Sequence, residues 1–581
     1  MKGLLVYLKD YKKESILGPL FKLLEASFEL IVPLVVASMI DVGIENGDKG
    51  YVIRMCLLMA ALGLTGLISS VTAQFFAAKA AVGFATKLRH ALFAHIQSLS
   101  FSNMDQQGTS TLITRMTSDI NQLQSGVNMV LRLFLRSPFI VFGAMIMAFT
   151  VDVKAALIFV VVIPLLSIVV FGILLISIPM FGKVQNYLDQ VLGTTRENLT
   201  GVRVIRAFGK EQEEIDKFDE QTDTLKQMQM VAAKISALMN PVTYIIINGG
   251  LMILIYTGAV RVEMGILTQG QVVALVNYMS QILVELVKLA NLIITVTKAV
   301  ACGNRVADVF QIQGGMAEYN QSFTEKERIL AEGEKGTVTF EGVSMKYYEG
   351  GEEALTDITF HAAQGETIGV IGGTGSGKTS LVHLIPRFYD VEKGSVKVDG
   401  VDVRDYALTA LRDKIGIVMQ KAVLFKGTIR ENLLWGNQNA SDEELWQALK
   451  MAQAEEFVVN KNGKLDAVVE QEGRNLSGGQ KQRLSIARAL VKKPEILILD
   501  DSASALDYAT DAKLRKAIKE MPGDTTVFIV SQRASSLMHA DRIIVLDDGN
   551  IAGIGTHQQL LESCEIYQEI YYSQFEKRDQ A

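Results

Sequence analysis

The sequence has few cysteines and little net charge for its length. Its 581 residues include three cysteines, Cys56, Cys302 and Cys564, whose spacing matches neither a disulfide framework nor a metal site. We therefore expect inert, reduced thiols. The net charge is only −6, and no tract of lysine and arginine is present. Because nucleic-acid binding needs a concentrated basic surface, we expect no nucleic-acid partner.

The beginning of the chain also lacks the features of a cleaved signal peptide. Residues Met1 to Lys13 are basic and amphipathic, but Lys22, Glu25 and Glu29 interrupt the apolar stretch behind them. No small-residue cleavage site follows. We expect no cleaved signal.

Long apolar runs fill the first half of the sequence instead. A run of about 20 apolar residues is long enough to cross a bilayer. Six such runs predict an all-α transmembrane domain with six spans. They are Ile16–Ile40, Val52–Ala78, Val127–Thr150, Ala155–Met180, Pro241–Val260 and Val272–Val300.

The connections between these runs predict the orientation of the chain. Three are short, whereas Lys79–Gly126 and Phe181–Asn240 are long, polar and rich in lysine and arginine. Positively charged loops remain in the cytoplasm, so these loops and both termini are expected there, in a multi-pass protein of the plasma (inner) membrane. Within the second loop, Asn186–Asn198 and Glu211–Ala233 have apolar residues at helical spacing, which predicts cytoplasmic helical extensions of the spans.

Several ionisable residues fall inside the predicted spans, where charge is costly. Glu25 and Glu29 share a face of the first span with Lys22; Arg132 and Arg136 lie in the third, and Glu285 and Lys288 in the sixth. Structural ion pairs, or positions on a cytoplasmic extension, are the favoured interpretation. Contact with a transported substrate is the alternative, and the sequence leaves it open.

The second half of the sequence has a different pattern, in which short β-branched strands alternate with helical segments. This pattern predicts an α/β domain with a mainly parallel sheet. We place the transmembrane domain at 1–313, a linker at 314–335 and the α/β domain at 336–581. The expected strands are Thr337–Phe340, Thr367–Ile371, Gly394–Asp399, Ile415–Val418, Ile496–Leu499, Thr526–Val530 and Ile543–Leu546.

A phosphate-binding loop lies between one of these strands and a predicted helix. It consists of Gly372, Gly373, Thr374, Gly375, Ser376, Gly377, Lys378 and Thr379, followed by Ser380. Glycines let backbone N–H groups approach phosphates, and a helix N-terminus favours the anion. Lys378 is expected to reach the β- and γ-phosphates, and Thr379 to hold Mg²⁺. The domain is therefore predicted to bind a nucleotide.

A second motif makes the nucleotide site specific. Leu476, Ser477, Gly478, Gly479 and Gln480 form the sequence LSGGQ, between the phosphate loop and an apolar strand that ends in Asp500. A phosphate loop with LSGGQ resembles the ATP-binding cassette (ABC) family. The resemblance implies an α/β P-loop ATP-binding cassette whose ATP is sandwiched against the LSGGQ of a second cassette, so that the chain works as a pair.

The resemblance also implies roles for other residues. Asp500 matches the Walker B aspartate, which holds Mg²⁺ through its waters, and Gln420 matches the Q-loop glutamine near the metal and the attacking water. Asp507 closes a segment, Ser504–Asp507, that is similar to the D-loop. Tyr347 matches the aromatic residue that stacks on adenine, with an ordinary edge-strand tyrosine as the alternative.

The first half resembles the membrane domain of type I ABC exporters. The likeness lies in Phe101–Asp105, with Leu112–Asp119 behind it, and in Glu197–Phe208. In that family the tips of these two loops are short coupling helices that rest on the cassettes, one of them on the cassette of the partner.

Two positions depart from the family pattern. Asp501 stands where a glutamate polarises the attacking water, and Gln532 stands at the position of the switch histidine. Aspartate is one methylene shorter, which alters the geometry that a general base needs, and glutamine cannot carry a proton. Together the departures resemble the degenerate-site subunit of a bacterial heterodimeric multidrug exporter.

The sequence therefore predicts ATP-driven export of amphipathic small molecules, drugs or lipids, by one half of a heterodimeric ABC exporter. The homologous partner would perform most of the hydrolysis. A slow homodimeric exporter is one alternative, and an ATP-gated channel or sensor built from the same parts is another. No accessory peptidase domain is visible, so export of processed peptides is less favoured. The sequence identifies neither the cargo nor the partner chain.

Overall fold

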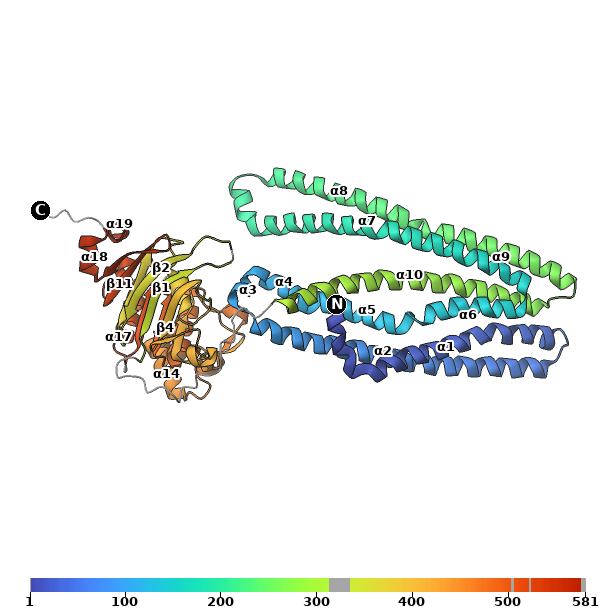
Figure 1. The fold of residues 1–581 in the computed structure, drawn as a ribbon, viewed down its shortest axis with the longest axis horizontal. Helices are drawn as coiled ribbons and strands as arrows, with labels where there is room; N and C mark the ends of the chain where they lie inside the picture. The colour runs from blue at the N-terminus through green and yellow to red at the C-terminus, as the bar shows by residue number, and fades with distance from the viewer. Residues whose placement is uncertain (1, 313–334, 349, 503–505, 522–523, 576–581) are drawn as a thin grey trace. The chain divides into compact units, whose positions relative to one another are not determined.

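A computed structural model describes residues 2–312, 335–348, 350–502, 506–521 and 524–575 (Figure 1). These residues form two compact units, a helical unit (Met1–Ser98 and Gly108–Gln313) and a cassette unit (Leu99–Gln107 and Gly314–Ala581). By its contacts the short helix α3 (Phe101–Gln107) belongs to the cassette unit, although it lies in the predicted transmembrane domain. Apart from Lys335, the predicted linker lies outside the described residues.

The helical unit contains six helical segments long and apolar enough to cross a membrane, which confirms the predicted number. Several continue beyond the apolar run, as expected for the second loop. Its elements are η1 (Lys2–Tyr11), α1 (Lys12–Ser38), η2 (Met39–Ile44), α2 (Lys49–Ser98), α4 (Thr109–Thr114), η3 (Arg115–Asp119), α5 (Ile120–Leu133), α6 (Arg136–Val151), α7 (Val153–Ala207), α8 (Glu211–Ala237), α9 (Met239–Glu263) and α10 (Gln269–Gln311).

The third span differs from its prediction, because it is not one continuous helix. α5 ends at Leu133 and α6 begins at Arg136, and the two residues in between keep right-handed helical dihedral angles while the helix is interrupted at them. Pro138 explains the interruption, since proline lacks the N–H that would otherwise donate to the carbonyl of Phe134. It is tolerated here because it lies in the first turn of α6.

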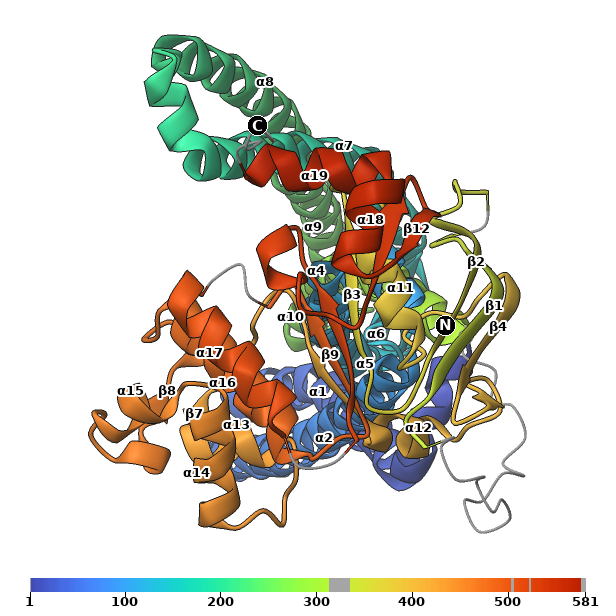
Figure 2. The same ribbon diagram turned by 90° about the vertical axis from the view of Figure 1, so that its left-hand side faces the viewer.

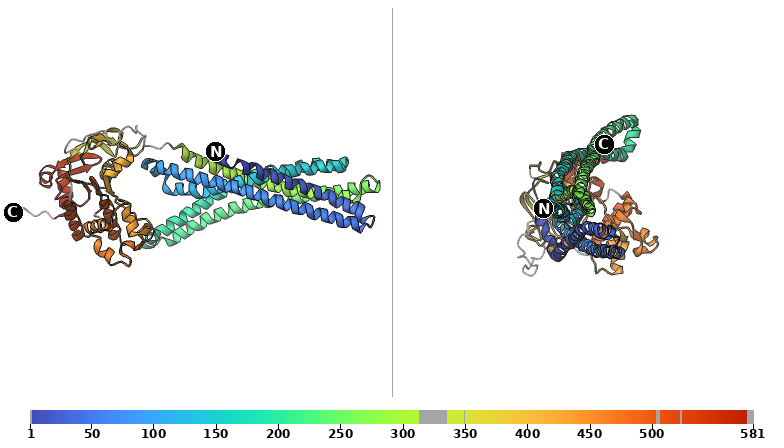
Figure 3. Two further views of the ribbon diagram at one scale, coloured as in Figure 1. Left: turned by 90° about the horizontal axis from the view of Figure 1, so that it is seen from below. Right: turned by 90° about the vertical axis from the view of Figure 1, so that its right-hand side faces the viewer.

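The α7–α8 hairpin separates from the other long helices toward its connecting turn (Figures 1 and 3). α8 packs against α7 and α9. Of its 27 residues only Leu225 and Ala232 are buried. At the tip of the hairpin, Leu199, Val204 and Phe208 are exposed apolar residues. Toward its connecting turn, the hairpin therefore has little packing within its own chain.

The cassette unit is built on a six-stranded sheet in the order β12-β11-β3-β10-β9-β6. The strands are β12 (Asn550–Gly555), β11 (Arg542–Asp547), β3 (Thr367–Gly372), β10 (Thr526–Val530), β9 (Ile496–Asp500) and β6 (Ile415–Val418), and all pairs but β11–β12 are parallel.

The alternating side chains of β9 show how this sheet divides the core, since successive residues point to opposite faces. Ile496 and Ile498 pack with α11 (Lys378–Leu384) and a second sheet, whereas Leu497 and Leu499 pack with α13 to α17. Figure 2 shows α16 and α17 on one side of the sheet and β1, β2 and β4 on the other. The predicted α/β architecture is confirmed.

The second sheet was not expected from the sequence. It is antiparallel, in the order β2-β1-β4-β5, with β1 (Val338–Met345), β2 (Leu355–Ala362), β4 (Lys393–Val398) and β5 (Val401–Asp402). Strand β2 buries alternate side chains only, which makes its sequence too polar to stand out as a strand. Because β1 lies between β2 and β4, and Tyr347 lies beyond its end, the edge-strand interpretation of Tyr347 is wrong.

The remaining elements of the cassette unit are mostly short helices. They are α12 (Leu408–Lys414), β7 (Gly427–Thr428), α13 (Ile429–Leu434), α14 (Asp442–Met451), α15 (Glu455–Val459), η4 (Lys464–Asp466), β8 (Val468–Val469), η5 (Gln471–Gly473), α16 (Gly478–Val491), α17 (Tyr508–Lys519), η6 (Ala534–Ser536), α18 (His557–Ser563) and α19 (Glu565–Gln574).

Candidate nucleotide-binding site

The phosphate loop connects the carboxyl end of β3 to the amino end of α11, which is where open α/β sheets bind their ligands. Gly375 and Gly377 have φ angles of +85° and +92°, a region that favours glycine. A Cβ at Gly372 would lie 2.1 Å from the carbonyl oxygen of Leu546. These glycines are therefore required by the backbone path of the loop.

Lys378 opens α11 and is buried under the loop. Its Nζ donates to the carbonyl oxygens of Gly372 at 2.9 Å and Gly373 at 2.5 Å. Burial lowers the pKa of Lys378, and the charges of Asp501 and Asp500 oppose that effect. A buried ammonium group held by carbonyls at this place suits the phosphates of a nucleotide.

Thr379 and Asp500 form an oxygen-rich pair that suits a magnesium ion. The hydroxyl of Thr379 donates to Oδ1 of Asp500 at 3.0 Å. Among the residues that the structure describes, Oδ2 of Asp500 is buried and has no hydrogen-bond partner. Hydroxyl and carboxylate oxygens are the ligands that Mg²⁺ prefers, directly or through water. The residues present therefore fit the ion that the sequence predicts.

Asp501 follows Asp500 in a left-handed backbone conformation, with φ of +44°. Its N–H donates to the carbonyl of Val530 at 3.1 Å, and its Oδ2 accepts from Nε2 of Gln420 at 3.4 Å. Burial, together with the charge of Asp500, raises the pKa of Asp501. The structure thus brings Gln420 and both carboxylates together.

Gln532 follows β10, the strand beside β9, and its side chain is exposed. Its backbone oxygen accepts from Nε2 of Gln574 at 2.8 Å, and Oε1 of Gln574 accepts from the N–H of Ala534 at 2.9 Å. The C-terminal helix α19 therefore fixes the backbone at this position. Nothing in the sequence pointed to Gln574 as that support.

Tyr347 lies against the start of α11. Its hydroxyl is 2.6 Å from the hydroxyl of Ser380, and its ring meets that of Tyr389 edge-on at 5.1 Å. The ring is 38% exposed. A partly exposed aromatic ring beside the phosphate loop is in the position expected for a group that stacks on a base.

The LSGGQ motif forms the amino end of α16. Leu476 is buried, and Ser477 caps the helix by accepting from the N–H of Gln480 at 3.3 Å. Oε1 of Gln480 accepts from the N–H of Ser477 at 3.1 Å, which completes a capping box. Ser477 and Gly478 are exposed, so the positive end of α16 faces solvent.

The structure describes only part of the predicted D-loop. Ser504 and Ala505 lie outside the described residues. Asp507 caps α17, because its Oδ1 accepts from the N–H of Thr510 at 2.9 Å. Hydrogen bonds from the backbone and side chain of Thr510 lower the pKa of Asp507.

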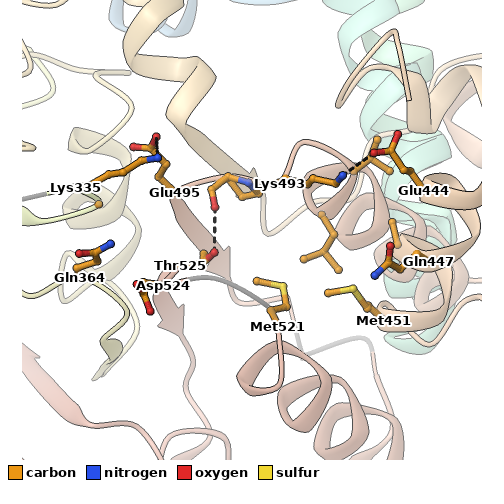
Figure 4. Close-up of a pocket in the computed structure, with 15 residues that line it drawn as sticks. Lys335, Gln364, Glu444, Gln447, Met451, Lys493, Glu495, Met521, Asp524 and Thr525 are labelled. Carbon is orange, nitrogen blue, oxygen red and sulfur yellow. Dashed lines mark hydrogen bonds and ion pairs between the residues drawn. The ribbon is translucent and has the colours of Figure 1, made fainter. Parts of the chain in front are cut away.

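The cassette also contains a cavity of about 380 Å³, shown in Figure 4, which is not the nucleotide site. Glu495 and Thr525 immediately precede β9 and β10, so the cavity lies at the amino ends of the parallel strands. Met451 and Gln447 reach it from α14, and Met521 follows α17. The phosphate loop lies at the opposite edge of the sheet.

Within the helical unit, the intramembrane charges form ion pairs between helices. Arg136 donates to Glu285 at 2.7 Å and to Glu29 at 2.6 Å, which joins α6 to α10 and α1. Glu285 also accepts from Ser137 at 2.8 Å and from Lys288 at 2.7 Å.

The remaining predicted intramembrane charges are those of Lys22, Glu25 and Arg132. Lys22 pairs with Glu25 at 2.5 Å, whereas Nε of Arg132 is buried and has no hydrogen-bond partner within the described ranges of the chain. The favoured interpretation as ion pairs thus holds for Glu25, Glu29, Arg136 and Glu285. Glu29, Glu285 and Lys288 also line a pocket of about 430 Å³, so contact with substrate remains a prediction.

Comparison with known proteins identifies similar chains over nearly the whole length. The family model described as ABC transporter transmembrane region matches residues 15–286, and the ABC transporter model matches residues 355–504. The ABC transporter ATP-binding protein YfiB of Bacillus subtilis (strain 168), itself uncharacterised, is 36% identical over 575 residues, which cover 99% of each chain.

Other relatives carry more specific names. YgaD of the same strain, named as a proposed multidrug export ATP-binding/permease protein, is 33% identical and covers 98% of each chain. An ATP-dependent lipid A-core flippase of Yersinia pestis bv. Antiqua (strain Antiqua) is 29% identical over 98% of this chain and 96% of its own. A solved bacterial Atm1-family ABC exporter with ATP bound has a TM-score of 0.80 at 22% identity, over 98% and 99% of the two chains, and therefore shows the fold.

Proposed function

Because this chain belongs to the ABC transporter family and is an ATPase-coupled exporter, we propose that it forms one half of a heterodimeric exporter. The observation that carries the proposal is the contrast between the complete phosphate loop and LSGGQ motif and the altered positions Asp501 and Gln532. The complete LSGGQ motif serves the ATP of the partner. The altered residues lie at the site where the phosphate loop of this chain binds its own ATP.

ATP at this site is held by the chain's own phosphate loop. Lys378 binds the β- and γ-phosphates, the N–H groups of the loop and α11 bind phosphate oxygens, and Tyr347 stacks on the adenine. Thr379 and Asp500 would hold Mg²⁺, which neutralises charge on the phosphates. Gln420 would lie near the metal and the attacking water, and Ser380 stays beside the base-stacking tyrosine.

Hydrolysis at this site is slow for geometric and chemical reasons. The carboxylate of Asp501 is about 1.5 Å shorter in reach than glutamate would be. Gln532 can hydrogen-bond the γ-phosphate but cannot carry a proton or a positive charge. This chain therefore retains its ATP, while Ser477 and Gly479 complete the site that hydrolyses the ATP of the partner.

The helical unit supports a pairing of two chains. Helix α8 buries only two of its residues, and Leu199, Val204 and Phe208 are exposed at the tip of the α7–α8 hairpin. In the cassette unit, the rings of Phe425 and Trp435 stack at 4.5 Å and are exposed. We propose that the hairpin tip of one chain rests on this aromatic face of the other.

ATP binding closes the two cassettes, and the coupling segments around α3 and the hairpin tip turn an inward-facing cavity outward. Hydrolysis and release then reset the exporter. The spans lie in the plasma membrane, and the cassettes and both termini lie in the cytoplasm. The basic long loops favour this orientation.

The transported substrate is an amphipathic small molecule, a drug or a lipid. Two relatives carry names that refer to multidrug export and to lipid A-core flipping. The pocket of about 430 Å³ combines apolar residues of α1 and α10 with Glu29, Lys288 and amide side chains. An apolar wall with charged groups suits a molecule that has both characters.

Expression of the chain alone, and together with a homologous chain that has Glu and His at the two altered positions, tests the proposal. We expect stable co-purification, ATPase activity only in the pair, and movement of an amphipathic dye against its gradient in proteoliposomes. Family-like ATPase rates from the chain alone would disprove the heterodimer. ATPase activity without uphill movement of any dye would contradict export of such molecules.

A further inference from the structure

Two buried polar atoms face each other beside the proposed metal site. Nε2 of His383, on α11, lies 3.5 Å from Oδ2 of Asp500, at the end of β9. Neither atom has a hydrogen-bond partner in the part of the chain that the structure describes. The residues are 9% and 1% exposed, so little water reaches them. Unpaired buried polar atoms are costly, which favours a state in which these two meet.

The ring of His383 is held by the two aromatic residues that follow α11. Phe388 meets it edge-on at 5.4 Å, and Tyr389 lies parallel to it at 6.5 Å. A ring packed in this way has few rotamers available. The position of its Nε2 therefore depends on Phe388 and Tyr389.

Both aromatic residues are in turn held by α3, which belongs to the same compact unit. Phe101 of α3 packs on Phe388 at 4.5 Å, and the hydroxyl of Tyr389 donates to Oδ2 of Asp105 at 2.8 Å. Burial and the bond to Asp105 raise the pKa of Tyr389, so its hydroxyl keeps the proton that it donates. A continuous row of side chains thus leads from α3 to Asp500.

We propose that His383 is a positioning residue for Asp500. Through His383, the position of α3 affects the orientation of the Asp500 carboxylate at the metal site. In the nucleotide-bound state His383 donates its Nε2–H to Oδ2 of Asp500. Oδ1, which accepts from the hydroxyl of Thr379 at 3.0 Å, would then be available to hold the ion. The proposal holds whether the partner is a different chain or a second copy.

The size of the expected effect follows from metal sites in general. Carboxylates that bind a metal are themselves held by hydrogen bonds, and loss of such a support typically costs about 10- to 100-fold in metal affinity. His383→Met keeps a similar volume but removes the donor. His383→Gln keeps a donor at a similar distance along the side chain.

The first experiment measures the Mg²⁺ concentration that half-saturates binding of a fluorescent ATP analogue. It uses the full chain in its assembled complex, with the phosphate-loop lysine of the partner replaced when the partner is a different chain. We expect His383→Met to raise this concentration about 10- to 100-fold, and His383→Gln to stay close to the parent. Nucleotide binding in EDTA and the melting temperature without Mg²⁺ should be unchanged in both variants.

Three outcomes of this experiment would overturn the positioning role. His383→Met could bind Mg²⁺ as the parent does. Both variants could lose Mg²⁺ affinity equally, which would assign the residue to packing alone. Binding in EDTA could fall in parallel with binding in Mg²⁺, which would place the defect in the nucleotide pocket as a whole.

A second experiment tests the connection to α3. Tyr389→Phe removes the hydroxyl that bonds Asp105 but keeps the ring, and Asp105→Asn is the matched control that keeps an acceptor. We expect Tyr389→Phe to weaken Mg²⁺ binding several-fold in the parent and to have no further effect beside His383→Met. Contacts that act through one shared residue are non-additive in this way. Additive effects of the two substitutions would show that His383 does not transmit the position of α3.

Discussion

Asp501 combines a left-handed backbone with a carboxylate that is held by Gln420. Aspartate is one of the few side chains that adopt positive φ at modest cost. The short side chain therefore suits the local backbone even though it reduces the reach of the carboxylate. The altered chemistry at this site is compatible with a well-ordered turn.

Asp501→Glu should raise ATP turnover at this site only modestly. General-base catalysis contributes about 10²- to 10⁴-fold when the rest of a site is in place, and here Gln532 still lacks the imidazole. Adding Gln532→His should give a larger gain. The measurement is turnover in a complex whose partner has lost its catalytic glutamate. A family-like rate from Asp501→Glu alone would show that Gln532 is a neutral replacement.

Arg136 is the residue on which the intramembrane ion pairs depend. Arg136→Met leaves the buried carboxylate of Glu285 without its main partner, a change that costs about 3–5 kcal/mol in buried pairs. Lys288 is half-exposed, so Lys288→Met should cost less than about 1 kcal/mol. Thermal unfolding in detergent compares the two variants. Equal shifts would mean that Arg136 and Lys288 contribute alike to the network.

At the scale of elements, the predictable parts are those whose sequence pattern reflects one simple environment. The sequence directly predicted the apolar spans and the buried strands β9 and β10. β2 was missed because only its alternate residues are buried, and the interruption between α5 and α6 was missed because Phe134 and Leu135, which form it, are both apolar. The contacts of His383 with Asp500 and of Gln574 with Gln532 and Ala534 join residues far apart in the sequence, so no local pattern could predict them.

Ser477 in the capping box of α16 has a structural role as a helix cap and a proposed functional role, and the two can be tested separately. Ser477 and Ser441 cap α16 and α14 in the same way, each with a partner at the third helical position. Replacing either serine with alanine should cost about 1 kcal/mol of stability. Only Ser477→Ala should also nearly abolish ATP turnover of the complex, because in the proposed pair only that hydroxyl contacts the ATP of the partner. Comparable loss of turnover in Ser441→Ala would contradict this assignment.

At the scale of the whole molecule, the two composite sites are expected to be unequal. Lys378→Ala disturbs the site that retains ATP, so some hydrolysis by the complex should survive. Ser477→Ala disturbs the site that hydrolyses ATP, so little should remain. Steady-state ATPase of both variants in the assembled complex is the measurement. Complete and equal loss in both would argue against a division of labour.

The sparse packing of the α7–α8 hairpin has a consequence for the cell as well as for transport. A chain made without its partner leaves Leu199, Val204 and Phe208 in water, and such apolar segments are what proteases and chaperones recognise. Unpaired chains should therefore be short-lived. The abundance of the exporter would then follow the scarcer of its two chains, so that synthesis of one subunit sets a ceiling on the amount of the other.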